Sequence, residues 1–251
     1  MTPAPPQRVL IVGATSAIAG HVAREYARRG AHLFLVARNA SRLRQLADEL
    51  AAQVCGTSTG NFDDLAANQA HVEAAIAALG GLDVAVIAHG WLPDQIETEH
   101  SLETAMRAVS SNFTSAVSFL IPLANHFEEQ RAGHLAVMTS VAGERGRPRN
   151  YTYGAAKSAT TTYLEGIRSR LYEAGVSVHD LRLGPVDTPM TADHPKTAVF
   201  GDAIEVARGI VVAIERDRRV AYLPAFWRPI MFVVRWLPEA IFQRFDFLSG
   251  R

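Results

Sequence analysis

Cysteine is almost absent from this chain of 251 residues, which contains only Cys55. A single cysteine can form neither an internal disulfide nor a zinc site made of cysteines, and scarce cysteine is typical of proteins from a reducing compartment. We expect Cys55 to be a buried packing residue rather than a reactive thiol. The cytoplasm is therefore the expected location.

The chain also lacks a long apolar run. No segment has the roughly 20 consecutive apolar residues that a transmembrane helix needs. The segment that comes closest, residues 226–248, is interrupted by charged side chains: Arg228, Arg235, Glu239 and Arg244. Residues 1–7 include three prolines and no apolar stretch, so they do not resemble a signal peptide.

An excess of charge of either sign is missing as well. Lysine plus arginine and aspartate plus glutamate each number 25, so the formal net charge is zero. Bulk electrostatics therefore do not indicate nucleic acid as a partner, and we expect none. The nine histidines do not show a metal-ligand spacing such as His-Glu-x-x-His. We therefore expect no metal site.

Apolar runs alternate along the chain with segments of helical periodicity. The expected strands are residues 8–12, 32–37, 53–57, 82–88, 134–140, 176–183 and 219–223. The expected helices are residues 17–29, 40–52, 65–79, 102–131, 152–174 and 202–216. Strands that read as continuous apolar runs are typical of parallel sheets buried between helices. The pattern predicts an α/β fold with a single Rossmann-type, doubly wound parallel β-sheet flanked by helices.

The length of the chain favours one domain over residues 1–251. We expect its core at about residues 8–223 and an amphipathic, helical C-terminal extension at about residues 226–248.

The first expected strand runs into Gly13 and a turn of small residues that precedes the first helix. In such a strand–turn–helix unit, backbone N–H groups at the helix N-terminus bind a pyrophosphate, although tight packing alone also produces turns of this kind. Dinucleotide sites usually have glycine where this chain has Ala17 and Ala19, which is compatible with the site only if the backbone there keeps ordinary helical angles. The expected cofactor contacts of this loop are Gly13, Thr15, Ser16, Ala17 and Ile18.

The residue after the second expected strand distinguishes between two nicotinamide cofactors. An Asp or Glu there binds the ribose 2′-hydroxyl of NAD, whereas a cation suits the 2′-phosphate of NADP. This chain has Arg38, and Arg42 follows one helical turn later. A surface arginine that contacts only solvent is the alternative. We predict NADP(H) as the cofactor, with NAD(H) less favoured.

Ser140, Tyr153 and Lys157 form the candidate catalytic group. Ser140 ends the fifth expected strand, at the edge of the sheet where ligands bind, and Tyr153 and Lys157 lie four residues apart on one face of a helix. A free phenol has a pKa of about 10 and is a poor acid–base catalyst at neutral pH. A neighbouring ammonium lowers that pKa by stabilising phenolate. We expect Ser140 to hold a substrate oxygen beside Tyr153, which gives or takes the proton during hydride transfer.

These motifs resemble the classical short-chain dehydrogenase/reductase family. Residues 139–143 and 153–157, with a serine-to-tyrosine spacing of 13, are similar to its active-site pattern, and the resemblance extends over about residues 8–223. It implies an oxidoreductase that transfers hydride between nicotinamide and a carbonyl or secondary alcohol. Asn112 stands where the family keeps an asparagine that orders a water for proton relay, which makes it a fourth catalytic candidate.

The same resemblance extends the candidate cofactor site. Residues 183–190 are similar to the Pro-Gly-x-x-x-Thr segment of the family, which implies that Val186 and Thr188 contact the nicotinamide carboxamide and that Tyr153 and Lys157 also touch the cofactor. Two other segments depart from the family pattern, because an Asn-Asn-Ala-Gly run and an adenine-binding Asp are replaced. The residues at these places, which the resemblance assigns to the cofactor site, are Ala88, His89, Gly90, Asn61 and Phe62. A catalytic role for His89 is the less favoured interpretation.

The segment at 226–248 has apolar residues at intervals of three and four, and Pro238 is expected to separate two short helices. In one interpretation these helices pack on the core or on another subunit; in the other they lie on a membrane or cover an apolar substrate. The alanine-containing loop, residues 88–90 and this tail are similar to those of reductases of polyprenylphosphate-linked 2-keto sugars. That similarity implies a bulky or lipid-linked carbonyl or alcohol substrate and peripheral contact with the inner face of a membrane.

We expect the substrate pocket to be lined by residues 91–96, 141–150 and 187–200. Its arginines, which are candidates for binding an anionic group or else exposed loop residues, are Arg145, Arg147 and Arg149. The family resemblance implies a homodimer or homotetramer. The alternatives to an enzyme are a catalytically idle, nucleotide-binding redox sensor and a structural partner, neither of which requires the serine, tyrosine and lysine together.

Overall fold

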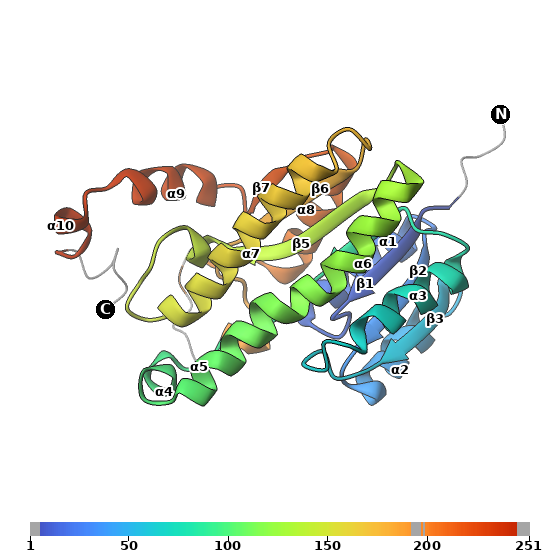
Figure 1. Cartoon of the computed structure of the whole chain (residues 1–251), viewed down its shortest axis with the longest axis horizontal. Helices are drawn as coiled ribbons and strands as arrows, with labels where there is room; N and C mark the ends of the chain where they lie inside the picture. The colour runs from blue at the N-terminus through green and yellow to red at the C-terminus, as the bar shows by residue number, and fades with distance from the viewer. Residues whose placement is uncertain (1–5, 192–196, 198, 245–251) are drawn as a thin grey trace.

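Seven parallel strands form one sheet in the order β3-β2-β1-β4-β5-β6-β7. The computed structural model describes residues 6–191, 197 and 199–244 (Figure 1). The strands are β1 Arg8–Val12, β2 His32–Ala37, β3 Val54–Thr59, β4 Val84–Ile87, β5 His134–Ser140, β6 Ser177–Leu183 and β7 Val220–Leu223. Because strand order reverses between β1 and β4, the sheet has the switch point at which doubly wound folds bind their ligands.

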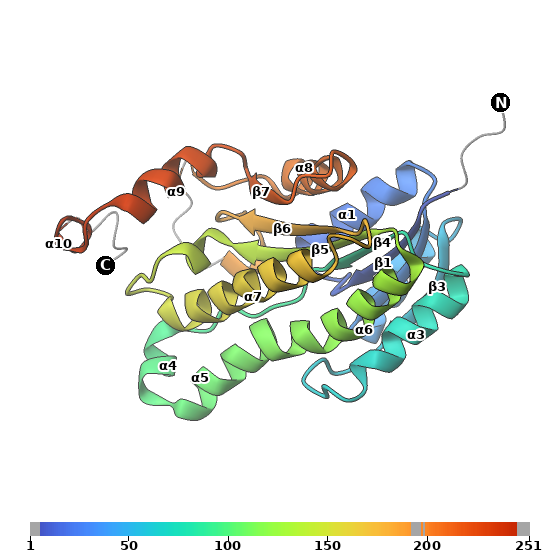
Figure 2. The same ribbon diagram turned by 45° about the horizontal axis from the view of Figure 1, so that its top comes forward.

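Helices cover both faces of the sheet, as Figure 2 shows. The helices are α1 Ala17–Arg28, α2 Ala40–Glu49, α3 Asn68–Leu79, α4 Gln95–His100, α5 Leu102–Val109, α6 Ser115–Gln130, α7 Tyr151–Arg170, α8 Ala203–Glu215, α9 Trp227–Trp236 and α10 Glu239–Phe242. The predicted α/β class and the parallel, doubly wound sheet are confirmed.

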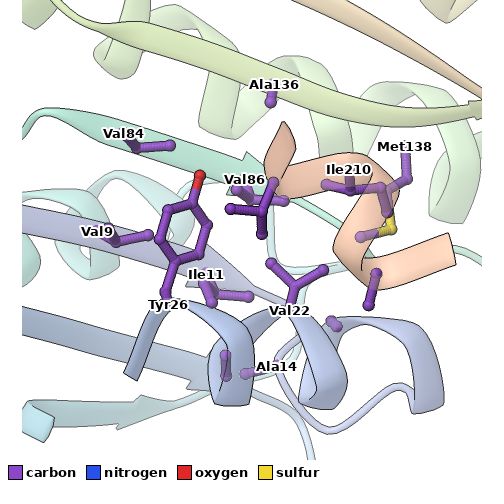
Figure 3. Close-up of a cluster of buried hydrophobic side chains, with 14 of the residues drawn as sticks. Val9, Ile11, Ala14, Val22, Tyr26, Val84, Val86, Ala136, Met138 and Ile210 are labelled. Atoms are coloured by element: carbon purple, nitrogen blue, oxygen red, sulfur yellow. The ribbon is translucent and has the colours of Figure 1, made fainter. Parts of the chain in front are cut away.

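The alternation of side chains along each strand divides the apolar interior into two cores. Val9 and Ile11 of β1 point into the core shared with α1, α2 and α8, shown in Figure 3. Leu10 and Val12 point into the core shared with α3, α6 and α7. All four are fully buried. Because successive residues of a strand face opposite sides, a strand covered on both faces must be apolar throughout, and this is why the strands were recognisable in the sequence.

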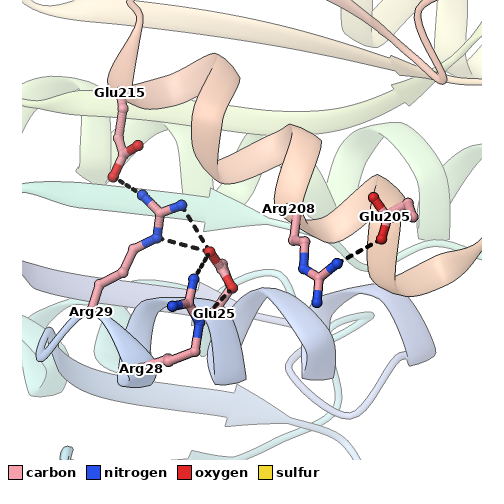
Figure 4. A network of polar contacts seen from close by, with 6 residues as sticks. All are labelled: Glu25, Arg28, Arg29, Glu205, Arg208 and Glu215. Atoms are coloured by element: carbon pink, nitrogen blue, oxygen red, sulfur yellow. Dashed lines mark hydrogen bonds and ion pairs between the residues drawn. The ribbon is translucent and has the colours of Figure 1, made fainter.

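Ion pairs join α1 to α8 at the rim of the first core (Figure 4). The Arg29 guanidinium binds both Glu25 on its own helix and Glu215 at the end of α8. Glu25 is buried, and its hydrogen bonds from Arg28 and Arg29 keep the pKa of its carboxyl below the ordinary value. The pairing orients the first helix, which starts directly at the glycine turn.

The helix expected over residues 102–131 is interrupted. A π-helical turn at Ser110–Thr114 separates α5 from α6, and the hydroxyls of Thr114 and Ser115 donate to the carbonyls of Ser110 and Ser111 there. Hydroxyl side chains that bond to nearby carbonyls compete with the regular helical pattern. The short helix α4 was not predicted; it begins after Asp94, which caps it by accepting from the Ile96 N–H.

The expectation that Cys55 is buried was wrong. Cys55 is exposed, because β3 is an edge strand whose side chains alternate between the core and solvent. The residue therefore lies on the solvent side of the strand.

The C-terminal tail forms two helices, α9 and α10, with Pro238 between them as predicted. Both views place the tail at the same end of the molecule as α4, α5 and the loop that leads into α7. Phe245 and the rest of the extension up to residue 248 lie outside the described residues. Within the described part of the chain, no helix combines the length and apolarity needed to cross a bilayer.

Candidate functional site

Ser140 stands at the carboxyl end of β5, where the chain turns sharply. It caps a short 3-10 turn, Val141–Glu144, by accepting a hydrogen bond from the Ala142 N–H at 3.1 Å. Its hydroxyl also donates to the Leu183 carbonyl at the end of β6, at 3.3 Å. The side chain is thus held between the ends of two neighbouring strands, at the edge where ligands of such sheets bind.

Two glycines allow this turn, which we call the Ser140 turn (residues 140–144), to approach α7 closely. A Cβ on Gly143 would lie 2.8 Å from the Ser158 nitrogen, and a Cβ on Gly154 would lie 2.7 Å from the Ala142 oxygen. Real Cβ atoms do not come so close to backbone, so both positions need glycine. The approach brings Tyr153 within hydrogen-bonding reach of Ser140. The three residues predicted as catalytic therefore lie together.

Burial dominates the acid–base properties of this group. It raises the pKa of the Tyr153 phenol to about 12, against the opposing effect of the hydrogen bond with Ser140. It lowers the pKa of the Lys157 ammonium to about 8, against the attraction of Asp180. The Lys157 Nζ donates to the Met138 carbonyl at 3.1 Å and lies 5.7 Å from the centre of the Tyr153 ring. Burial thus favours the neutral phenol over phenolate.

Asn112 lies within the π-helical turn, and its amide holds the chain that follows β4. Its Nδ2 donates to the carbonyls of Trp91 at 2.6 Å and Ala108 at 2.9 Å, while its Oδ1 accepts from the Trp91 N–H at 3.1 Å. A Cβ on Gly90 would lie 2.7 Å from that Oδ1 and 3.4 Å from the Lys157 Nζ. Gly90 therefore lies between the Asn112 amide and the lysine.

Within the described glycine loop, the positive φ angle falls on Gly13 and not on the alanines. Gly13 has a φ of 83°, and a Cβ there would lie 2.8 Å from the His89 nitrogen. Ser16 caps α1 by accepting from the Ala19 N–H at 3.3 Å, and Ala17 is already the first residue of the helix. Gly13 is the one residue of the described loop with positive φ, so alanine at position 17 is no obstacle to the turn.

A polar hollow of about 280 Å³ adjoins this loop, between α1 and α2. Its basic lining residues are His21, Arg24 and Arg42, although Arg24 is already paired with Glu49 at 2.6 Å. Arg38 is exposed just beyond β2, and its charge contributes to the lowered pKa of His89. Of the two cations that the sequence indicated, Arg42 lines this hollow and Arg38 lies outside it.

The residues that depart from the family pattern occupy the ends of β3 and β4. Burial lowers the pKa of the His89 imidazole to about 3, so the ring is neutral, and its Nε2 hydrogen-bonds the Ser115 hydroxyl at 2.8 Å. The Phe62 ring is buried against His89, which leaves only its backbone for a cofactor. Asn61 is exposed and accepts from the Asp63 N–H, while Ala88 packs against the first core.

Val186 and Thr188 lie in the segment after β6. Val186 is buried and bridges to Gly201, and the Thr191 hydroxyl donates to its carbonyl at 2.7 Å. The Thr188 N–H donates to that same hydroxyl at 3.3 Å. The part of the expected pocket at 192–196 and 198 lies outside the described residues.

The structure gives Arg145 a different role from the one expected. Its guanidinium binds two carbonyls and a carboxylate of the tail, at Val234, Leu237 and Glu239. The sequence analysis also missed Gln95, which is buried on α4 and accepts the Thr152 N–H beside Tyr153 at 3.1 Å. A lone glutamine carries no recognisable motif, so only the fold reveals this contact.

At the opposite edge of the sheet, ligand atoms of His134, His179 and Asp217 lie within 4.8 Å of one another. The two rings hydrogen-bond each other at 3.0 Å, and the His179 Nδ1 donates to the Arg218 carbonyl. Burial lowers the pKa of His179 to about 4. These bonds satisfy both nitrogens of the buried His179 ring. The absence of a metal remains a prediction.

Comparisons with known proteins identify the family. The short chain dehydrogenase family model matches residues 7–198. An uncharacterized oxidoreductase of Mycobacterium tuberculosis is 34% identical over 239 residues, which cover 94% of this chain and 96% of the relative. The chain belongs to the short-chain dehydrogenase family.

A second relative and a solved structure agree with this assignment. An uncharacterized oxidoreductase of Streptomyces coelicolor is 34% identical over 96% of both chains. The crystal structure of levodione reductase matches with a TM-score of 0.80 at 22% identity, covering 88% of this chain and 97% of the other, which supports the fold. This short-chain dehydrogenase is therefore an oxidoreductase that uses a nicotinamide cofactor and acts on a small-molecule substrate.

The geometry of the glycine loop fits such a cofactor. Gly13 lets the turn lie directly against His89, whose nitrogen would be only 2.8 Å from a Cβ at position 13. The His89 Nδ1 is buried there with no hydrogen-bond partner among the described residues. A buried polar atom without a partner indicates that another polar group completes the site. Gly13, Ser16, Arg38 and His89 remain the predicted contacts of a dinucleotide.

Replacing Lys157 by methionine tests the effect of burying this ammonium. The lowering of its pKa from 10.5 to about 8 corresponds to roughly 3 kcal/mol of lost stability. Between these two pH values the unfolded chain holds the proton and the folded protein does not, so wild-type stability rises with pH there. We expect the stability advantage of Lys157→Met, measured by urea unfolding, to be largest below pH 8 and to shrink as pH approaches 10.5.

Lys157→Met also loses the hydrogen bond to Met138, which lowers the stability of the variant by an amount that does not depend on pH. The test is therefore how the stability difference between variant and wild type changes with pH. A difference that stays constant over this range would contradict the prediction. The chain has only one other lysine, Lys196, so a Lys196→Arg variant leaves a single lysine signal whose titration can be followed directly by NMR.

Proposed function

We propose that this short-chain dehydrogenase is an NADP(H)-dependent carbonyl reductase or alcohol dehydrogenase in which Tyr153 is the general acid and base. The observation that carries the proposal is the convergence of Ser140, Tyr153 and Lys157 at the carboxyl edge of the sheet. The cofactor, when bound, supplies or accepts the hydride. The reaction belongs to the class that interconverts a carbonyl group and a secondary alcohol.

In this mechanism Ser140 donates a hydrogen bond to the substrate oxygen and holds it beside the phenol. Tyr153 gives its proton to that oxygen as the carbonyl is reduced, and takes it back in the reverse direction. The Lys157 ammonium lies 5.7 Å from the ring centre and stabilises the phenolate that forms. Burial raises the pKa of Tyr153 and weakens it as an acid, so the phenolate needs this stabilisation.

Asn112 supports the same group in the proposed mechanism. Its backbone carbonyl accepts from the Thr160 hydroxyl at 3.1 Å, and its side chain holds the backbone of Trp91, the neighbour of Gly90. From this position it orders a water that returns the proton to the lysine and the tyrosine. Val186 and Thr188, at the end of β6, hold the carboxamide of the nicotinamide.

Replacing Tyr153 by phenylalanine tests the reaction. The variant keeps the ring but has no proton to give, so we expect turnover of a ketone to fall by at least about 10³-fold. The affinity for NADPH, followed by cofactor fluorescence, stays within about twofold because the ring and its packing remain. Full activity of Tyr153→Phe would contradict the mechanism, and intact binding with no wild-type turnover would favour the redox-sensor alternative.

Arg38 supports the choice of NADP(H). It directly follows β2, and its charge acts on His89 beside the glycine loop. No carboxylate stands at this strand end to bind a ribose 2′-hydroxyl. A guanidinium there attracts the 2′-phosphate.

Removing this cation with Arg38→Ala tests the preference. We expect the dissociation constant for NADPH to rise at least about tenfold, as loss of a charge-assisted hydrogen bond predicts, with little change for NADH. Arg44→Ala, on the exposed face of α2, is the matched control. Equal affinities of the wild type for both cofactors would refute the assignment.

The tail supports the proposal of a bulky or lipid-linked substrate. The face of α9 opposite the core carries an exposed apolar stripe at spacings of three and four: Pro229, Phe232, Val233 and Trp236. Trp236 is 77% exposed and Phe232 is 67% exposed. Arg228 and Arg235 flank the stripe. Aromatic residues flanked by cations are typical of helices that lie on anionic membranes, which is how we propose that the enzyme reaches such a substrate.

Vesicle sedimentation tests the membrane contact. We expect the full-length protein to pellet with anionic phosphatidylglycerol vesicles, and Phe232→Ser with Trp236→Ser to abolish pelleting because both apolar anchors are lost. Ile204→Ser, which removes an exposed apolar residue on α8, is the control. If the wild type does not pellet, the proposed membrane contact is wrong, while the oxidoreductase proposal is unaffected.

An oligomer completes the proposal. The outward face of α7 has a hollow of about 680 Å³ whose apolar lining includes Phe113, Tyr163 and Ile167. A second copy that packs its own α7 here forms a dimer of the kind the sequence indicated.

A further inference from the structure

The Ser140 turn contacts the C-terminal tail through both apolar packing and polar bonds, although the two segments are far apart in the sequence. Val141, directly after Ser140, belongs to a small apolar core that is separate from the two cores of the sheet. The other buried members of this core all come from the tail: Trp227, Met231, Val234 and Phe242. The side chain of Val141 is 4% exposed. The residue that follows the candidate catalytic serine therefore packs on the tail.

Arg145 adds a polar connection immediately after the turn. Its Nη1 donates to the carbonyls of Val234 at 2.5 Å and Leu237 at 2.6 Å, and its Nη2 pairs with Glu239 at 2.7 Å. The guanidinium also lies 4.0 Å from the centre of the Phe242 ring. The last carbonyls of a helix have no partners within the helix, and a cation stabilises that end of its dipole. Arg145 thus caps α9 from a different part of the chain.

Glu144 forms a second polar connection. Its Oε2 accepts from the Tyr222 hydroxyl at 3.1 Å and lies 3.6 Å from Arg182 and 3.8 Å from Arg235 of α9. Burial raises the pKa of this carboxyl despite those cations. Glu144 thus ties the turn to β6, β7 and α9, whereas Arg145 reaches the C-terminal end of α9 and the start of α10.

The opposite side of the turn contacts the helix that carries the other two candidate catalytic residues. Gly143 lies against the backbone of Lys157 and Ser158, and the Ala142 carbonyl lies against Gly154, the neighbour of Tyr153. These contacts are between backbone atoms, with no flexible side chain to absorb a shift. A displacement of the turn therefore changes the distance between Ser140 and Tyr153 directly.

We propose that the tail is a working part of the active site and that Arg145 is its positioning residue. By capping α9, Arg145 holds the Ser140 turn against α7 in the geometry that Ser140, Tyr153 and Lys157 need. The inference rests on the proposed function for the roles of those three residues. Arg145 touches neither the substrate nor the cofactor and acts through the turn alone.

Hydrogen–deuterium exchange of the full-length protein tests the connection without a substrate. We expect Arg145→Met to quicken amide exchange at least about tenfold in both residues 140–145 and residues 234–242, because the cap and the anchor of the turn are lost together. We expect Arg145→Lys to exchange at an intermediate rate, because an ammonium reaches the carbonyls but lacks the planar, multiple donors of a guanidinium. Arg208→Met removes a single exposed ion pair on α8 and is the control. Faster exchange in the tail alone would overturn the proposal.

Turnover provides the second measurement, on a ketone that the wild type reduces. We expect kcat of Arg145→Met to fall at least about tenfold, with partial rescue in Arg145→Lys. We expect the dissociation constant for NADPH to stay within about twofold, because the glycine loop and Arg38 follow β1 and β2, whereas the turn contacts β6, α7 and the tail. Wild-type kcat in a variant whose turn exchanges quickly would refute the positioning role. If the wild type reduces no ketone, the proposed function fails, and exchange still decides whether Arg145 couples the tail to the turn.

Discussion

The close backbone approach between the Ser140 turn and α7 is the constraint on which the candidate site depends. Gly143 and Gly154 permit it, since a Cβ at either position would overlap backbone atoms of the other segment. The parallel sheet supplies one side of this contact, because β5 delivers Ser140 to the carboxyl edge. Helix α7 supplies the other, and the tail holds the turn from behind through Val141 and Arg145.

Desolvation governs the chemistry that this contact creates. It disfavours charge on both partners, raising the pKa of Tyr153 and lowering that of Lys157. The same effect leaves His89 neutral beside the glycine loop. Forming phenolate in such a site therefore requires a nearby positive charge that offsets the cost of burial.

Much of the fold could be predicted because its signals are local. The bounds of β1, β2 and β5 agree with the expected strands at 8–12, 32–37 and 134–140, since a strand buried on both faces is a continuous apolar run. The π-helical turn at Ser110–Thr114 and the short α4 were missed, because hydroxyl–carbonyl bonds and a single Asp cap decide them. The exposed position of Cys55 was missed because it depends on β3 being an edge strand.

The sequence by itself determined the alternation of strands and helices, the family motifs and the residue types of the candidate site. Periodicity and spacing along one chain are sufficient for these. Only the tertiary structure decided that Arg145 caps the tail instead of facing an anion, that Gln95 holds the backbone beside Tyr153, and that burial sets the pKa of both Tyr153 and Lys157. Each of these depends on which distant segments meet and how much water they exclude, and neither quantity is encoded in local spacing.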